Sequence, residues 1–330
     1  MATLETQQLD ETIANTRRKM ITMGGAALAA IVFGGSTKKA QAQSTVTDAD
    51  ILNFALNLEY LEAQFYNLAV YGVTIDKLPT PIPVAVNGGT AGTVTLSPAF
   101  AAVPFSIPLV KSYATETAGE EGKHVSFLQS ALGTSAVSMP DIDLFNSFNT
   151  LATAAGLGAA FNPFSSDANF LIGAYIFEDV GVSAYHGAAG LIQDKVNILP
   201  AAVGIHAVEA YHAGLIRTTI NGLDAGTGTL NGITQKISAA RSALANSGGA
   251  TTTTFTGTMA DDIGVGTTKV ALNGASATFT AATIVDCDSN ALAWGRTPSQ
   301  ILSIVTGVSP ALASGNKGVF FPSGLNGNVN

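Results

Sequence analysis

The stretch Glu121-Gly-Lys-His124, matched in form by Glu209-Ala-Tyr-His212, decides the fold of this chain. The sequence holds nine glutamates and four histidines in 330 residues, so two Glu-x-x-His pairs would arise by chance well under about 1% of the time. Residues three apart on a helix lie on one face, so each pair presents a carboxylate and an imidazole in the same direction. Each pair therefore predicts a helix that carries two ligand-type side chains on one side.

A second regularity lies upstream of these pairs. Glu59 precedes Tyr66 by seven residues, and Glu178 precedes Tyr185 by seven. Each Glu and Tyr combination is followed along the chain by one Glu-x-x-His pair. The repeat predicts two helical hairpins, each supplying a single Glu from its first helix and a Glu-x-x-His pair from its second.

Four long helices are predicted from apolar residues at three- and four-residue spacing and from signals at their ends. Thr47 and Asp50 form a capping pattern at the start of the first helix, and Pro108 can open the second. The four segments run from about 47 to 71, 108 to 132, 167 to 192 and 201 to 220. A short turn joins the last two, whereas the long segment 133–165 joins the second to the third. This pattern predicts an all-α four-helix bundle with one long crossover between helices two and three.

The remaining segments are richer in Gly, Pro and Thr. An insertion at 73–106 separates the first two helices, and Thr90–Leu96 within it is expected to pair as a short hairpin. A fifth helix, from about Ile233 to Asn246, completes a bundle domain that spans 47–246. The extension 247–330 has no independent core and is expected to wrap the bundle. Its expected elements are short strands at Thr252–Thr256 and Ala275–Thr280, a capped helix at Pro298–Thr306 and an irregular tail at Gly318–Asn330.

Composition limits the classes of partner. The chain is 47% hydrophobic and 12% charged, which is typical of a compact protein with a large core. Its formal net charge of −8 and the lack of a basic stripe argue against nucleic acid as a partner. Cys287 is the single cysteine, so the chain cannot form an internal disulfide.

Residues 1–42 have the pattern of an export signal. Thr16-Arg-Arg-Lys-Met-Ile21 resembles a twin-arginine motif, an apolar run of 15 residues follows at 21–35, and Ala40-Gln-Ala42 fits a cleavage site. The run is shorter than the roughly 20 residues needed to span a bilayer, and an uncleaved anchor or a buried helix is the alternative. We expect export to the periplasm or the exterior, with a mature chain that starts near Gln43 and has no transmembrane segment.

Five stretches of the sequence resemble one known family, the exported ferritin-like domain proteins related to plant desiccation-related proteins. They are Ile51–Tyr66, Phe177–Asp179, Ala207–His212, Arg296–Leu302 and Phe320–Pro322. The resemblance covers most of the chain from Ile51 onward and implies a ferritin-like bundle. It implies an association with stress and little about activity, because the family is described mostly by its fold.

In ferritin-like bundles, two Glu-x-x-His pairs and two single glutamates hold two metal ions between the four helices. The matching set in this sequence is Glu59, Glu121, His124, Glu178, Glu209 and His212. Two unit charges of one sign 4 Å apart repel by about 4 kcal/mol at an effective dielectric of 20, so four carboxylates in a dry bundle need compensation. Two divalent ions balance their four negative charges. Carboxylate and imidazole ligands favour iron or manganese, and zinc stays open.

Glu62 is the alternative to Glu59 on the first helix. It lies one turn further along the same face, where it is either a supporting residue behind the ligands or an extra bridging carboxylate. The family's spacing of seven residues between Glu and Tyr favours Glu59 as the ligand. The hydroxyl groups of Tyr66 and Tyr185 are expected to reach the carboxylates of the site.

Three other polar residues lie near the Glu-x-x-His pairs. His206 lies one turn before Glu209 and either orients it or is an ordinary core or surface histidine. Glu116 and Glu120 are expected on the solvated face of the second helix.

Three functions are consistent with the sequence. The leading one is an exported two-metal protein with redox chemistry, either iron oxidation or peroxide disposal, whose partners are metal ions and a small oxidant. The alternative is a structural or desiccation-protective protein in which the metal only ties the helices together. A storage cage ranks last, because the 73–106 insertion would obstruct cage packing. The sequence leaves homo-oligomerisation open.

Overall fold

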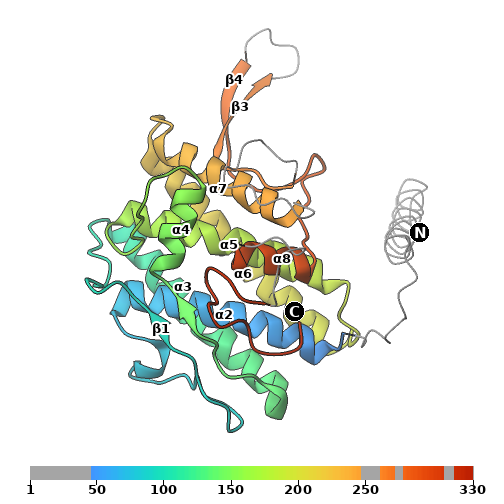
Figure 1. The fold of residues 1–330 in the computed structure, drawn as a ribbon. Coiled ribbons are helices and arrows are strands. Elements are labelled where there is room, and N and C mark those ends of the chain that lie inside the picture. The colour runs from blue at the N-terminus through green and yellow to red at the C-terminus, as the bar shows by residue number, and fades with distance from the viewer. Residues whose placement is uncertain (1–45, 247–260, 272–277, 308–315, 330) are drawn as a thin grey trace, which may run out of the picture. The chain divides into compact units, whose positions relative to one another are not determined.

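The computed structural model describes residues 46–329, apart from 247–260, 272–277 and 308–315. Four long helices lie alongside one another and form the body of the molecule (Figure 1). They are α2 (Asp48–Tyr71), α3 (Pro108–Leu132), α5 (Asp167–Ala189) and α6 (Ile198–Asp224). Helix α2 packs mainly on α3, and α5 packs mainly on α6. The expected all-α bundle is confirmed, whereas the expected export signal lies outside the described residues.

The ends of the first two helices are those that local chemistry predicts. The Thr47 side chain accepts a hydrogen bond from the backbone N–H of Asp50, whose carboxylate bonds back to the N–H of Thr47. Gly72 ends α2 in the left-handed region, with φ of 71°, which glycine adopts without a Cβ clash. Pro108 is the first residue of α3, and Gly133 follows its last.

The last two helices have different bounds from those expected. Helix α5 ends at Ala189 rather than near Ile192. Helix α6 begins at Ile198 rather than near Ala201 and continues to Asp224, past the expected end near Ile220. The reason is Asp224, whose buried carboxylate accepts the backbone N–H groups of the next helix and so sets the boundary one turn later.

The crossover between α3 and α5 contains a helix that the sequence did not predict, α4 (Asn146–Ala154). Asp143 caps it, because Oδ1 accepts the N–H groups of Phe145 and Asn146 at 2.8 and 2.7 Å. Phe148 on α4 is buried and packs edge-on against Phe177 of α5. Tertiary packing therefore stabilises a helix too short to be stable alone.

The expected hairpin at Thr90–Leu96 is wrong. The strand β1 (Val94–Thr95) pairs in parallel with β2 (Ile142–Asp143), so its partner is in the crossover and not in the insertion. Asp141 strengthens this pairing by accepting the N–H and hydroxyl of Thr93 at 2.8 and 3.0 Å. The two long connections of the bundle are thereby joined along one side.

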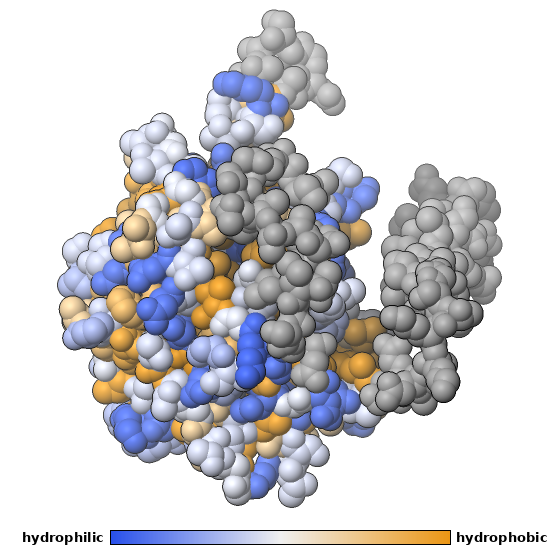
Figure 2. All heavy atoms as spheres, viewed as in Figure 1, coloured by the Kyte–Doolittle hydropathy of each residue, from blue (hydrophilic) through white to orange (hydrophobic). Residues whose placement is uncertain are grey.

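The C-terminal extension lies on the bundle. It follows α7 (Thr229–Asn246) and contains α8 (Pro298–Thr306), which starts with the expected capping box at Thr297 and packs on α5 and α7. Further along, Asn326 exchanges hydrogen bonds of 2.8 and 2.9 Å with Asn57 of α2. In the view of Figure 1, the described surface of the molecule has polar and apolar residues interspersed (Figure 2).

The extension also forms a two-stranded hairpin, β3 (Gly266–Ala271) and β4 (Thr278–Thr283), which points away from the helices (Figure 1). The strand expected at Ala275–Thr280 overlaps β4 at Thr278–Thr280, and its first three residues lie outside the described residues. The strand expected at Thr252–Thr256 lies outside the described residues. The expectation of a mostly irregular tail after Gly318 agrees with the described part of that segment.

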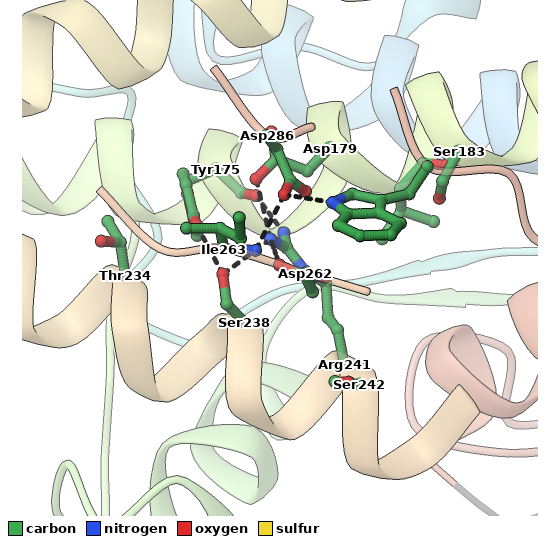
Figure 3. A network of polar contacts seen from close by, with 12 residues as sticks. Tyr175, Asp179, Ser183, Thr234, Ser238, Arg241, Ser242, Asp262, Ile263 and Asp286 are labelled. Atoms are coloured by element: carbon green, nitrogen blue, oxygen red, sulfur yellow. Dashed lines mark hydrogen bonds and ion pairs between the residues drawn. The ribbon is translucent and has the colours of Figure 1, made fainter. Parts of the chain in front are cut away.

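Buried charges fasten the extension and α7 to the bundle (Figure 3). Arg241 of α7 bonds to Asp179 of α5 at 2.7 Å and to Asp262 of the extension at 2.8 Å. Arg217 of α6 shares Asp179 at 2.8 Å, and Arg296 contacts Asp262 at 3.0 Å. Removing one member of such a network leaves an uncompensated buried charge, so these contacts fix α5 relative to α6 and α7.

Candidate metal centre

Each of the four long helices places a candidate ligand glutamate in the bundle interior. Glu59 comes from α2, Glu121 from α3, Glu178 from α5 and Glu209 from α6. Glu59, Glu121 and Glu209 have no solvent exposure, and Glu178 has 1%. The two histidines of the Glu-x-x-His pairs, His124 and His212, are buried beside them. Carboxylates this dry require either protons or cations.

These six side chains fall into two overlapping groups whose ligand atoms lie within 4.8 Å of one another. The first group is Glu59, Glu121, His124 and Glu209, and the second is Glu121, Glu178 and His212. Glu121 belongs to both groups and therefore lies between them. The structure thus brings together all six residues that the sequence singled out as ligands.

Both histidines direct Nδ1 at the carboxylates. His124 Nδ1 lies 3.2 Å from Glu59, 3.3 Å from Glu121 and 3.5 Å from Glu209. His212 Nδ1 lies 2.9 Å from Glu121 and 3.4 Å from Glu178. The two rings face one another with centroids 6.4 Å apart.

The donor atoms fit a pair of divalent ions. Although His212 Nδ1 and Glu121 Oε1 are close, neither has a partner with hydrogen-bond geometry, and the same holds for Glu178 Oε2 and both oxygens of Glu209. A buried polar atom without a partner costs about 1–3 kcal/mol. Atoms that converge without bonding to one another are satisfied together by a cation placed among them. Oxygen and imidazole nitrogen are ligands that iron and manganese accept.

Two tyrosines cross-link the bundle behind the carboxylates. Tyr66 of α2 donates its hydroxyl to Glu178 of α5, and Tyr185 of α5 donates to Glu59 of α2. The hydroxyl groups therefore reach the carboxylates as expected, and each Tyr serves the opposite helix. This reciprocal arrangement follows from the repeat of seven residues in the sequence and holds Glu59 and Glu178 in place.

Glu120 was expected on the solvated face, and this expectation is wrong. Its Oε2 accepts from His212 Nε2 at 2.7 Å, with the Glu120 side chain 33% exposed. In the tautomer that binds a metal, Nε2 carries the hydrogen and Nδ1 offers its lone pair to the centre. Because Glu121 points into the bundle, the adjacent Glu120 lies at the edge of α6 and can reach His212. Residue spacing within one helix does not reveal such a contact between helices.

Two supporting residues have different places. Glu62 is buried on α2 but belongs to neither ligand group. His206 was a candidate to orient Glu209, but its ring instead lies edge-on to that of His186 with centroids 5.8 Å apart, and its Nε2 has no hydrogen-bond partner. His206 lies on the α5–α6 contact one turn away from the centre.

Burial and mutual repulsion set the protonation of the carboxyl groups. Burial raises the pKa of Glu59 to about 7, against the opposing effect of His124. Burial, reinforced by the neighbouring Glu121, raises the pKa of Glu62 and Glu209 well above their usual range. Glu121 is the exception: burial acts to raise its pKa, but the neighbouring imidazoles of His124 and His212 outweigh burial and lower the pKa to about 2.

Without metal ions, protonated His124 and His212 supply the positive charge that compensates the carboxylates. Burial acts to lower the pKa of His124, but the Glu59 carboxylate raises it to about 11. The pKa of His212 changes in the same way: burial acts to lower it, but the carboxylates of Glu178 and Glu121 raise it well above its usual range. The side chains thus hold protons where divalent ions would otherwise supply positive charge, so metal binding releases protons.

Gly181 makes room for the centre, a feature that sequence reasoning missed. A Cβ added at this position of α5 would lie 2.2 Å from Glu209 Oε2. The absent side chain lets Glu209 occupy the space between α5 and α6. The only signal in the sequence is a glycine within a helix, three residues after a ligand, where glycine otherwise costs stability.

A third group of carboxylates, Asp179, Asp262 and Asp286, also lies close together among the described residues. Arg217 and Arg241 bond to it directly, as Figure 3 shows for Arg241. Arginine charge already neutralises this group, so it does not call for a metal ion.

Comparison with known proteins agrees with this geometry. The model of one family, described as the ferritin-like domain, matches residues 47–222. This chain belongs to the ferritin-like domain family. The matched residues run from the N-cap of α2 almost to the end of α6, so they include every helix that contributes to the centre.

Two curated relatives of this ferritin-like protein are informative. It is 32% identical over 178 residues to desiccation-related protein PCC13-62 of Craterostigma plantagineum, a match that spans 53% of each chain. It is 25% identical over 294 residues to ferritin-like catalase Nec2 of Nesocodon mauritianus, covering 86% of this chain and 84% of the relative. The second match therefore extends over the C-terminal extension as well as the bundle.

No solved structure gives a significant match to this ferritin-like protein. Among its described helices, none combines the length and apolar character required to cross a membrane.

Proposed function

We propose that this ferritin-like protein holds two divalent ions, manganese or iron, and disproportionates hydrogen peroxide to water and dioxygen. The observation that carries the proposal is the convergence of four dry carboxylates and two imidazole nitrogens, five of whose inward atoms, on Glu121, Glu178, Glu209 and His212, lack hydrogen-bond partners. The relative named a ferritin-like catalase, matched over most of both chains, supports the choice of peroxide.

The reaction balances without a further reductant. One peroxide molecule is oxidised to dioxygen and yields two protons and two electrons, and a second accepts them to become two water molecules. A pair of redox-active metal ions supplies the electron storage that such a cycle needs. The protein provides a buried carboxyl group outside both ligand groups, Glu62, whose raised pKa lets it hold a proton.

The remaining residues position the ligands. Tyr66 and Tyr185 fix the carboxylates of Glu178 and Glu59 through their hydroxyl groups. Glu120 fixes the tautomer and ring orientation of His212. Ligands held in this way need little rearrangement during a reaction. This preorganisation favours a catalytic role over a metal that only ties the helices together.

Metal analysis and peroxide turnover test this function. The wild-type protein, refolded with manganese or iron, should bind two equivalents and release one dioxygen for every two peroxide molecules consumed. Glu121→Gln removes the carboxylate common to both groups and should abolish turnover and lower the metal content. Glu116→Gln, an exposed position on the same helix, is the matched control and should leave both unchanged. A wild type that binds two ions but does not consume peroxide would refute the catalytic assignment.

The alternative is a non-catalytic, desiccation-protective role, which the relative of higher identity favours by its name. Iron oxidation is a variant of the redox role. In the non-catalytic case, loading with metal raises the melting temperature but neither peroxide nor ferrous iron is turned over. The same assays therefore separate the three.

We further propose that the protein acts outside the cytoplasm. The support is the twin-arginine pattern at 16–21 and the cleavage pattern at 40–42. Replacing Arg17 and Arg18 with Lys should retain the protein in the cytoplasm, whereas replacing Lys38 and Lys39 with Arg should not. Exported wild-type protein with Met1 still in place would contradict cleavage near Gln43.

A further inference from the structure

Helices α2 and α5 contact one another sparingly, and the layer formed by α4, α7 and α8 covers the seam between them. A cavity of about 50 Å³ lies beneath this layer. Its walls are apolar side chains of five helices, including Leu61 of α2, Val180 of α5 and Ala240 of α7. Glu62 and Arg241 are the two charged residues in its lining.

The charged residues do not make this cavity a polar site. The guanidinium of Arg241 is bonded to Asp179 and Asp262, which neutralise its charge. Its aliphatic stem can therefore line an apolar space at no cost. Glu62 is buried and adds little to the lining of the cavity, almost all of which is apolar. A cavity with apolar walls stays dry and takes up small apolar molecules, and about 10–15 Å³ already suffices for one water-sized molecule.

A second cavity continues along the same seam. It has a volume of about 30 Å³ between α2, α5 and α6, and it shares Leu58, Glu62 and Gly181 with the first. Tyr185, which donates to the ligand Glu59, also lines it. Gly181 backs directly on Glu209, since a Cβ there would meet the Glu209 carboxylate. Both cavities are therefore separated from the metal centre by the thickness of one residue.

We propose that the two cavities along the α2–α5 seam bind dioxygen and let it leave the centre. Dioxygen is small and apolar, so it partitions into dry apolar space, whereas hydrogen peroxide and metal ions do not. The direction of traffic rests on the proposed peroxide disproportionation, in which dioxygen is the product. The C-terminal extension then has a role of its own, because α8 and the buried Phe320 form part of the outer wall.

Xenon tests gas binding independently of catalysis. Crystals of the full chain under xenon pressure should show the gas in the larger cavity, with or without metal. Ala240→Leu fills that cavity from α7, and Leu151→Phe fills it from α4, so each should exclude xenon. Ala239→Leu lies on the same helix outside the cavity and should leave xenon bound. Absence of xenon from the wild-type cavity would overturn the proposal, whatever the enzyme does with peroxide.

Steady-state kinetics tests the direction. Blocking the exit should lower kcat for peroxide several-fold in Ala240→Leu and Leu151→Phe, while kcat/KM, metal content and melting temperature stay close to wild type. A fall in kcat/KM with kcat unchanged would mean that the seam admits peroxide instead, which overturns the proposal. Unchanged kinetics in a variant that excludes xenon would overturn it as well. If wild type binds xenon but does not consume peroxide, the proposed function fails while the gas site stands.

Discussion

At the scale of single residues, the centre depends on neighbours that are not themselves ligands. Glu120 holds His212, Gly181 yields space to Glu209, and the hydroxyl of Tyr185 holds Glu59. None of these contacts is between residues of one helix. Each acts on the direction in which a ligand atom points, so its loss should weaken metal binding more than it weakens the fold.

Glu120→Gln tests the support of His212. The amide can still accept from Nε2–H but lacks the negative charge that keeps that hydrogen in place, so we expect metal affinity to fall by about 10–100-fold. Isothermal titration with manganese on refolded protein measures the change. Glu116→Gln on the exposed side of α3 should have no effect, and an equal loss in both variants would contradict a specific role for Glu120.

Gly181→Ala tests the space beside Glu209. The new methyl group must displace the carboxylate, so we expect a loss of about 1–3 kcal/mol in unfolding free energy together with reduced metal content. Gly204→Ala, in α6, meets nothing within 4 Å and should stabilise by about 0.5–1 kcal/mol. Denaturant unfolding of both variants gives the comparison, and stabilisation by both would remove the argument for Gly181.

At the scale of elements, the buried ion network positions α5, which carries Glu178. Asp179 follows this ligand directly and takes hydrogen bonds from Arg217 and Arg241, so the rotation of α5 is set from two neighbouring helices. Asp286 lies at the edge of the same network and accepts from the Ile263 N–H at 2.8 Å and from the Trp294 indole at 2.9 Å. Figure 3 shows Asp286 beside Asp179.

The network predicts a pH dependence of stability. Burial, with Asp262 and Asp179 nearby, raises the pKa of Asp286 from 3.8 to about 7. The folded protein therefore keeps a proton that the unfolded chain has lost, so stability falls as pH rises from about 4 to 7 and stays low above that. Asp286→Asn keeps both hydrogen-bond acceptor contacts and should flatten this fall.

The measurement is the melting temperature of metal-loaded protein at pH 5 and pH 8. Wild type should lose more stability between these values than Asp286→Asn. Asp288→Asn is the control, because hydrogen bonds from the Leu292 and Asn290 backbone lower the pKa of Asp288, which is ionised at both pH values. An Asp286→Asn variant with the same pH dependence as wild type would show that Asp286 is not the titrating group.

At the scale of the whole molecule, the proposed metal centre and the fold should stabilise each other. All four long helices contribute side chains to the two candidate ligand groups, so ions bound there would favour the folded chain over the unfolded one. A ligand present at about 100 times its dissociation constant adds about 2.7 kcal/mol to stability. Without ions, the same side chains are held together by protons on histidine and glutamate.

Chelation should therefore lower the melting temperature of loaded wild type by several degrees, and added manganese or iron should restore it. Calorimetry with parallel elemental analysis measures both. Glu121→Gln cannot complete either ligand group, so chelator should change its melting temperature little. If metal is removed from wild type with no change in melting, the ions do not hold the helices together.

The sequence by itself determined the bundle and the six converging side chains. Helix ends at Thr47, Gly72 and Pro108 follow from capping and backbone chemistry that acts over a few residues. The spacing of three within Glu-x-x-His and of seven between Glu and Tyr selects one face of each helix, because the helical repeat is fixed. Local rules of this kind need no knowledge of neighbouring elements.

Only the tertiary structure decided what lies between elements. The pairing of β1 with β2, the stability of α4, the contact of Glu120 with His212 and the turning of His206 towards His186 all join segments far apart in the chain. The larger cavity along the α2–α5 seam likewise exists only once the extension covers it. Such contacts depend on the distance and rotation between helices, which packing sets and which periodicity within a single helix does not encode.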